Sequence, residues 1–166
     1  GLEAQDIKVL TQAEGLKKGL VVAINKWDLI EKETNTALEY KNLIRERLQT
    51  LDYIPIITIS AVTKQRLYKL IDKALEVEAE RHKRIPTSEL NEWIGPVIAR
   101  HTPPLYRNQR VKIKYVTQVR SAPPVFQFFT NHPKGIREPY RRYIKNQLRK
   151  EYGFEGVPLK LVFKQK

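Results

Sequence analysis

The chain has 166 residues, of which 31 are Lys or Arg and 18 are Asp or Glu, so its net charge at pH 7 is +13. Its 41% hydrophobic and 30% charged residues are typical of a folded globular protein and argue against wholesale disorder. The absence of Cys excludes disulfides, thiolate chemistry and Cys-ligated zinc, and no apolar run approaches the roughly 20 residues of a membrane helix.

The excess positive charge is confined to one half of the chain. Residues 1–85 hold 15 basic and 13 acidic residues, a net +2, whereas residues 86–166 hold 16 and five, a net +11. Such an asymmetry predicts a polyanionic partner for the second half, with a solvated basic surface as the alternative. Together with the lack of Cys, the composition leads us to expect a cytoplasmic protein with no membrane contact.

The first half reads as alternating helices and strands. Short apolar runs predict strands buried on both faces, and spaced apolar positions such as Leu67, Leu70, Ile71 and Ala74 predict helices. The expected order is helix 5–18, strand 20–24, helix 35–50, strand 54–59 and helix 64–83. This order indicates an α/β fold with a parallel sheet. Two strands are fewer than such sheets usually have, so we expect an incomplete doubly wound domain.

Polar residues directly follow both strands. Asn25-Lys26-Trp27-Asp28 comes after the first strand, and Ser60-Ala61 comes after the second. Ligands of open α/β sheets bind at the carboxyl ends of the strands. An Asp carboxylate can accept two hydrogen bonds from the adjacent donors of guanine, a pattern that adenine lacks. The alternative is a strand-end turn in which Asp28 or Asn25 caps backbone groups.

These two segments resemble the fourth and fifth guanine-recognition motifs of small GTPases. The resemblance implies that the chain binds the guanine of GTP or GDP. It implies that Asp28 contacts the base edge and that Asn25 holds the two loops together. It also implies that the aliphatic stem of Lys26 lies along the plane of the base.

The second motif carries its own implied roles. The backbone N–H of Ala61 is expected to donate to the guanine carbonyl, and Ser60 is expected to brace the loop. Many members of the family have Lys after the Ser-Ala pair, where this chain has Val62. The stacking on the second face of the base is therefore expected to be weaker here.

The P-loop and switch regions of a GTPase are missing from the sequence. No G-x-x-x-x-G-K-[ST] segment occurs, so no glycine-rich loop can cradle phosphates. The segment 1–6 resembles the stretch that follows these elements in the family, and the chain contains no Met. We therefore expect the front part of a longer protein to be absent. Mg²⁺ and GTP hydrolysis are expected in the complete parent only; we assign no catalytic or metal-binding residue and expect this part alone to be inactive.

The second half predicts a different fold. Helices are expected from a Ser88 cap to about residue 100 and over 139–152. Strands are expected over 111–120, 125–130 and 159–164. In the first strand the odd-numbered residues from Val111 to Val119 are expected to share one face, and Lys112, Lys114 and Arg120 the other. The order helix, strand, strand, helix, strand indicates an α+β layer with helices on one side of a small sheet.

Basic residues gather on the last helix and on the first of these strands. Arg side chains suit phosphate, and many such contacts give a salt-dependent affinity with little sequence preference. The alternatives are a solvated helix face or docking onto the companion domain. The candidate RNA-binding residues are Lys112, Lys114, Arg141, Arg142, Lys145, Arg149 and Lys150.

The second half also resembles the KH-like domain that ends the EngA/Der double GTPases. The segments that carry the resemblance are 123–126, 129–131, 139–144 and 153–159. With Asn25-Lys26-Trp27-Asp28-Leu29, the resemblance spans essentially the whole chain. It divides the sequence into the rear of a second G domain, residues 1–85, and a KH-like domain, residues 86–166.

The resemblance implies a GTP-binding factor of ribosome biogenesis that acts in assembly of the large subunit. The expected partners are guanine nucleotide, rRNA or the large ribosomal subunit, and the adjacent G domains of the parent. The alternative is a non-enzymatic module that docks proteins, with the G-domain remnant as structural support.

The segment Gly153-Phe154-Glu155-Gly156 matches the G-x-x-G pattern of RNA-binding KH domains. It follows the last helix, however, whereas the RNA-gripping loop should precede that helix. Glu155 would repel a phosphate. We therefore interpret the segment as a helix C-cap in which Gly153 has a positive φ.

Overall fold

The computed structural model describes residues 2–30 and 36–165, and the chain forms two compact units. The first unit comprises residues 1–80 with 154–158, and the second comprises residues 81–153 with 159–166. The division thus falls five residues before the boundary expected at 85/86. The segment Phe154–Pro158, which the expected division placed in the second half, belongs to the first unit. Asn35, the expected start of a helix, and Gly1 lie outside the described residues.

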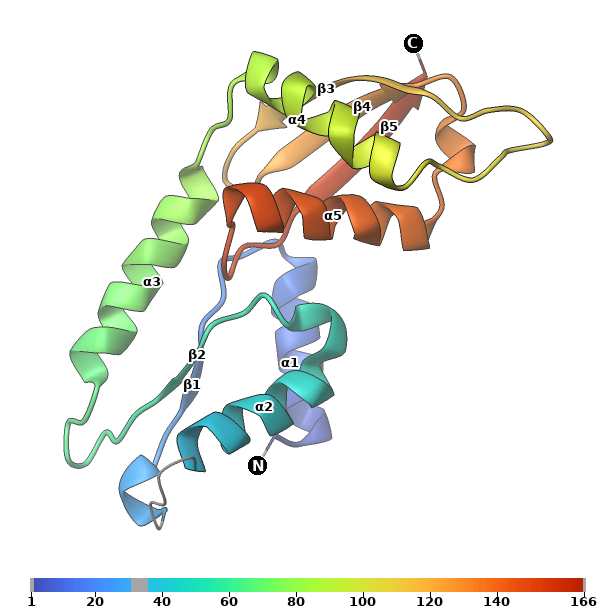
Figure 1. The fold of residues 1–166 in the computed structure, drawn as a ribbon. Helices are drawn as coiled ribbons and strands as arrows, with labels where there is room; N and C mark the ends of the chain where they lie inside the picture. The colour runs from blue at the N-terminus through green and yellow to red at the C-terminus, as the bar shows by residue number, and fades with distance from the viewer. Residues whose placement is uncertain (1, 31–35, 166) are drawn as a thin grey trace. The chain divides into compact units, whose positions relative to one another are not determined.

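The helices and strands of the first unit occur in the predicted order (Figure 1). The strands pair in parallel, with Val22 opposite Ile56 and Ile24 opposite Thr58. Two short 3-10 helices, η1 (Trp27–Leu29) and η2 (Gln49–Leu51), follow β1 and α2. The α-helices and strands are α1 (Ala4–Gly15), β1 (Val22–Ile24), α2 (Thr36–Leu48), β2 (Ile56–Thr58) and α3 (Leu67–His82).

The core of the first unit lies around β2. Ile44 and Leu48 of α2 cluster with Leu51, Ile54 and Ile56, all at most 7% exposed. The expectation that both strands are buried on both faces was wrong for β1, where Ala23 is exposed and its neighbours are half-buried. The physical reason is that, within the described part of the chain, β1 pairs with β2 alone and its other edge carries no strand.

The expected apolar face of α3 is also largely uncovered. Ile71 is 55% exposed, and Ala74 is exposed too. The buried position of α3 is Val77, which is 3% exposed. Helical spacing identified the helix correctly, but it could not identify the covered side because that depends on the neighbouring elements.

The late segment Phe154–Pro158 is built into the first unit. Phe154 and Val157 are fully buried, and the Phe154 N–H donates to the Glu80 carboxylate at 2.6 Å. Gly156 donates its N–H to the Tyr53 carbonyl and accepts from the N–H of Leu20, both at 2.8 Å. These contacts make the segment an additional element of a unit that is more than 70 residues away in sequence.

Gly153 ends the preceding helix as the sequence predicted. It has φ 87°, and its N–H donates to the Arg149 carbonyl at 2.9 Å, so the interpretation as a helix C-cap is confirmed. Glu155 forms an ion pair with Lys73 at 3.1 Å. The G-x-x-G segment, residues 153–156, therefore forms a helix cap and a buried connection.

The second unit has the predicted order of helix, strand, strand, helix, strand. Its sheet has the order β3–β4–β5, with β3 antiparallel and β5 parallel to the central β4. In Figure 1 both long helices lie in front of the three strands. The elements are α4 (Thr87–Arg100), β3 (Ile113–Arg120), β4 (Val125–Thr130), the short 3-10 helix η3 (Pro133–Gly135), α5 (Glu138–Tyr152) and β5 (Lys160–Gln165).

The helices and the sheet of the second unit both contribute buried apolar side chains. The Tyr140 hydroxyl donates to the His101 carbonyl at 2.8 Å, and the Tyr143 hydroxyl donates to the Val97 carbonyl at 2.7 Å, which links α5 to α4. The core side chains are Leu90, Ile94, Val97, Val116, Phe126, Phe128, Tyr140, Ile144 and Leu148.

The helix α4 begins at Thr87, and its N-cap residue is Pro86. The expected cap at Ser88 was therefore wrong by two residues.

Strand β3 departs from its predicted alternation. Val116 is fully buried and Gln118 is 7% exposed, whereas Val119 is 48% exposed. The pairing with β4 shifts register between Ile113 and Tyr115 and again between Gln118 and Arg120. Because one extra residue moves the following side chains to the other face, the first shift places the even-numbered residues inward.

We predict that Gly156→Ala destabilises the first unit by at least about 2 kcal/mol, because the left-handed backbone disfavours a Cβ and the site has no space. Gly156 has φ 71°, and an added Cβ would lie 2.6 Å from the Leu20 carbonyl oxygen and 2.7 Å from Val77. Urea unfolding followed by Trp27 fluorescence in a Trp93→Phe background measures the effect. Gly15→Ala, where a Cβ meets nothing within 4 Å, is the control and should change stability by less than about 1 kcal/mol. Equal effects of the two substitutions would contradict this assignment.

Candidate functional site

The two loops that carry the candidate guanine-recognition residues leave the same edge of the parallel sheet. The Ile59 N–H donates to the Ile24 carbonyl at 2.7 Å, and the Trp27 N–H donates to the Ile59 carbonyl at 3.0 Å. These bonds continue the pairing of β1 and β2 beyond the strands. The segments beginning at Asn25 and Ser60 therefore start from adjoining positions.

Asn25 joins the two loops through its side chain. Its Oδ1 accepts the N–H of Ala61 at 3.1 Å and the N–H of Lys26 at 2.7 Å. Lys26 is exposed and has φ 60°, in the left-handed region. The Ala61 amide, which we expect to donate to guanine, thus donates to Asn25 in this structure.

Asp28 lies on a turn that an aromatic pair fixes in place. Trp27 begins η1, is 2% exposed, and packs edge-on against Tyr40 of α2 with ring centroids 5.7 Å apart. Asp28 is the next residue and is half-buried. The motif identified Asp28 as a candidate site residue. No local pattern pointed to Tyr40, because it contacts Trp27 only in the folded chain.

The second loop is braced by Ser60. This residue is fully buried, its Oγ accepts the Thr63 N–H at 3.1 Å, and its own N–H donates to the Gln65 carbonyl at 3.1 Å. Val62, at the tip, is 84% exposed. The Arg66 guanidinium donates to the Thr58 hydroxyl, so the return of the loop is tied to the end of β2.

Positive charge gathers near the start of α3. Burial lowers the pKa of Lys41 below its ordinary value, and the charges of Lys69, Arg66 and Arg45 lower it further. Four cations from α2 and from the region where α3 begins therefore influence one another. The first unit as a whole holds 12 basic and 14 acidic residues, a net −2, so this concentration is local.

The second unit holds 19 basic and four acidic residues, a net +15. The separation of charge is sharper than the division of the sequence at residue 85 showed. Arg81, Lys83 and Arg84 belong to the second unit, and Glu155 belongs to the first.

The seven basic candidates do not form one surface. Lys112 and Lys114 are exposed at the start of β3, one edge of the sheet. Arg141 lies toward the other edge, since its guanidinium is 4.8 Å from the ring centre of Phe163 on β5. Its Nε also donates to the Ile136 carbonyl at 2.9 Å, which gives Arg141 a structural role.

The remaining candidates lie on α5. Arg142 and Lys150 are exposed, whereas Lys145 and Arg149 are half-buried. Lys150 lines a cavity that α5 shares with α4. Of the seven candidates, the exposed ones are therefore Lys112, Lys114, Arg142 and Lys150.

Within residues 2–30 and 36–165, no group of three or more His, Asp or Glu side chains is placed to hold a metal ion. None of the helices described there is long and apolar enough to cross a membrane.

Comparison with known proteins relates both units to one family. Residues 84–164 match the family model described as the KH-domain-like of EngA bacterial GTPase enzymes, C-terminal. Over all 166 residues the chain is 46% identical to GTPase Der of Chloroherpeton thalassium, 44% to that of Chlorobium phaeobacteroides and 43% to that of Amoebophilus asiaticus. The chain spans 38% of the length of each of these relatives.

We predict that Asn25→Ala loosens the junction of the two loops, because the Ala61 amide loses its acceptor. The loss of one hydrogen bond, worth about 1 kcal/mol, should speed hydrogen exchange at the Ala61 N–H by about fivefold. Exchange measured by NMR tests this. Asn42→Ala, an exposed position on α2, is the matched control and should leave the Ala61 exchange unchanged. Unchanged exchange in Asn25→Ala would show that the bond does not hold the loops together.

Proposed function

Because the chain belongs to the EngA/Der family of GTPases, we propose that it supplies guanine recognition and ribosome contact to a GTP-binding assembly factor of the large ribosomal subunit. In this proposal the first unit is the rear half of a P-loop, doubly wound G domain, and the second is a KH-like module that contacts rRNA. The protein acts in the cytoplasm. Phosphate binding, Mg²⁺ and hydrolysis belong to residues beyond this chain.

The hydrogen bond from Ala61 to Asn25 is the observation that supports guanine recognition most. It brings the loop that contains Asp28 beside the loop braced by Ser60, as a single base would require. Asp28 supplies two acceptors to the adjacent donors of guanine. Asn25 turns its Oδ1 away when the Ala61 N–H donates to the base carbonyl.

Ribosome contact is supported by the net charge of +15 on the second unit. A surface of this kind attracts the phosphates of RNA with little regard to sequence. Lys112 and Lys114 are the strongest candidates because both are exposed and they lie two residues apart where the edge strand β3 begins. The G-x-x-G text has no part in this contact, since its residues form a cap and a buried connection.

For guanine recognition we predict that Asp28→Asn, in a protein that also contains the phosphate-binding half, shifts preference from guanine toward xanthine nucleotides by about 100-fold or more. The substitution replaces one acceptor by a donor, and each hydrogen bond to a charged group is worth about 1.5–3 kcal/mol. Competition binding of GDP and xanthosine diphosphate measures the shift. Asp72→Asn, an exposed acid on α3, should leave the preference unchanged. Retained guanine preference in Asp28→Asn would refute the assigned role.

For RNA contact we predict that Lys112→Gln with Lys114→Gln weakens binding to rRNA and lowers the salt slope of log K by about 1.5, the share of two phosphate contacts. Mobility shifts across a salt series measure both quantities. The same change in charge in the first unit, Lys8→Gln on α1 with Lys18→Gln after the end of α1, is the control and should alter neither quantity. Absence of any shift at low salt would instead favour a module that docks proteins.

A further inference from the structure

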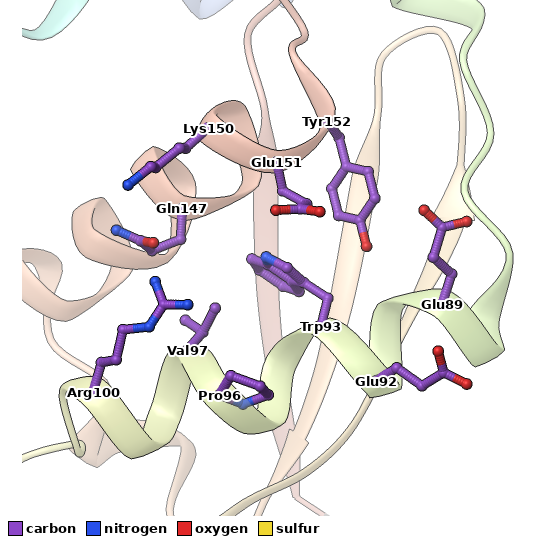
Figure 2. A pocket seen from close by; sticks show the side chains of 10 residues that line it. All are labelled: Glu89, Glu92, Trp93, Pro96, Val97, Arg100, Gln147, Lys150, Glu151 and Tyr152. Atoms are coloured by element: carbon purple, nitrogen blue, oxygen red, sulfur yellow. The ribbon is translucent and has the colours of Figure 1, made fainter.

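A cavity of about 450 Å³ lies between α4 and α5 in the second unit (Figure 2). Trp93 of α4 and Tyr152 of α5 pack edge to face within its lining, with ring centroids 5.8 Å apart. Both rings are half-buried, so each keeps part of its surface open to the cavity. A volume in this range accommodates a large side chain or a small ligand.

Carboxylates surround this pair of rings. Glu89 and Glu92 come from the first half of α4, and Glu151 precedes Tyr152 on α5. In Figure 2 the Glu151 carboxylate lies beside the indole of Trp93, and the Tyr152 hydroxyl points toward the α4 side. We call this end of the cavity the aromatic–acidic pocket, formed by Glu89, Glu92, Trp93, Glu151 and Tyr152.

The gathering of acids here is unusual for this unit. The unit has four acidic residues, three of which line this pocket, while the fourth, Glu138, begins α5. Among the described residues, none of the three pocket carboxylates forms an ion pair, although Arg100 and Lys150 line the other end of the cavity. The acids are therefore not arranged to neutralise the cations of their own unit.

The three carboxylates also act on the hydroxyl of Tyr152. Burial raises the pKa of Tyr152, and the charges of Glu89, Glu151 and Glu92 raise it further, to about 12. A cation in the pocket would meet the electron-rich faces of the rings as well as the carboxylates. The same carboxylates would repel a phosphate, so this pocket does not suit RNA.

We propose that the aromatic–acidic pocket docks an arginine side chain of a partner protein. Arginine fits better than a simple metal cation because its planar guanidinium stacks on aromatic rings and is weakly hydrated. The polypeptide on either side of that arginine can place an acidic group against Arg100 and Lys150, so a protein segment matches both ends of the cavity. The module thus has two partners of opposite charge, RNA on its basic surface and a cationic protein segment here.

NMR of the ¹⁵N-labelled chain tests the proposal, because the two tryptophans give separate indole N–H signals. The probe is acetyl-Gly-Gly-Arg-Gly-Gly-amide, and its counterpart carries citrulline, which has nearly the shape of arginine without the charge. The Trp93 signal should shift saturably as the arginine peptide is added. The chain should bind the citrulline peptide about tenfold more weakly. Trp27, 2% exposed in the first unit, should not respond.

Charge substitutions complete the test. Glu89→Gln with Glu151→Gln should weaken binding of the arginine peptide at least about fivefold, and both residues are exposed, so the fold should tolerate the change. Glu138→Gln removes the remaining acid of the unit and should leave binding within about twofold. The proposal is overturned by an absent Trp93 shift, by equal binding of the citrulline peptide, by equal weakening in Glu138→Gln, or by an RNA oligonucleotide that shifts Trp93 as the arginine peptide does.

Discussion

The path of the chain depends on two hydrogen bonds made by the backbone of Gly156. One of them reaches Tyr53 and the other Leu20, while Phe154 and Val157 fill the interior of the first unit. As a result the chain leaves the first unit after Glu80, returns to it for Phe154–Pro158 and leaves it again. Only glycine fits at position 156, because its backbone is left-handed and the Leu20 carbonyl stands where a Cβ would be.

This path also explains why the charge separates so sharply. The boundary of the folded units assigns three cations to the second unit and returns Glu155 to the first, where it pairs with Lys73. Three of the four acidic residues that remain in the second unit lie together in the aromatic–acidic pocket, and the fourth, Glu138, begins α5. Nearly uniform positive charge is what a sequence-blind contact with RNA needs, and a local exception to it is what a second, oppositely charged partner needs.

The two loops proposed to recognise guanine are held together by few elements. Two strands of three residues each end at one edge, and a single side-chain amide, that of Asn25, ties their loops together. Trp27 and Tyr40 then hold the turn that carries Asp28. The groups proposed to contact the base are polar and partly exposed, whereas Trp27 and Ser60, which hold their loops in place, are buried.

The sequence by itself located each α-helix and strand that the structure describes, because apolar runs and periodic spacing are local properties of the chain. It also identified the C-cap at Gly153 and the segments that resemble guanine-recognition motifs, since these depend on a few neighbouring residues.

Only the tertiary structure decided which faces are covered. A register shift with β4 sets the inward side of β3, and the missing neighbour of β1 leaves that strand half-buried. The late segment in the first unit and the aromatic–acidic pocket join residues about 60 to more than 130 positions apart. No local pattern encodes such pairings, because each is specified by the packing of two distant elements against each other.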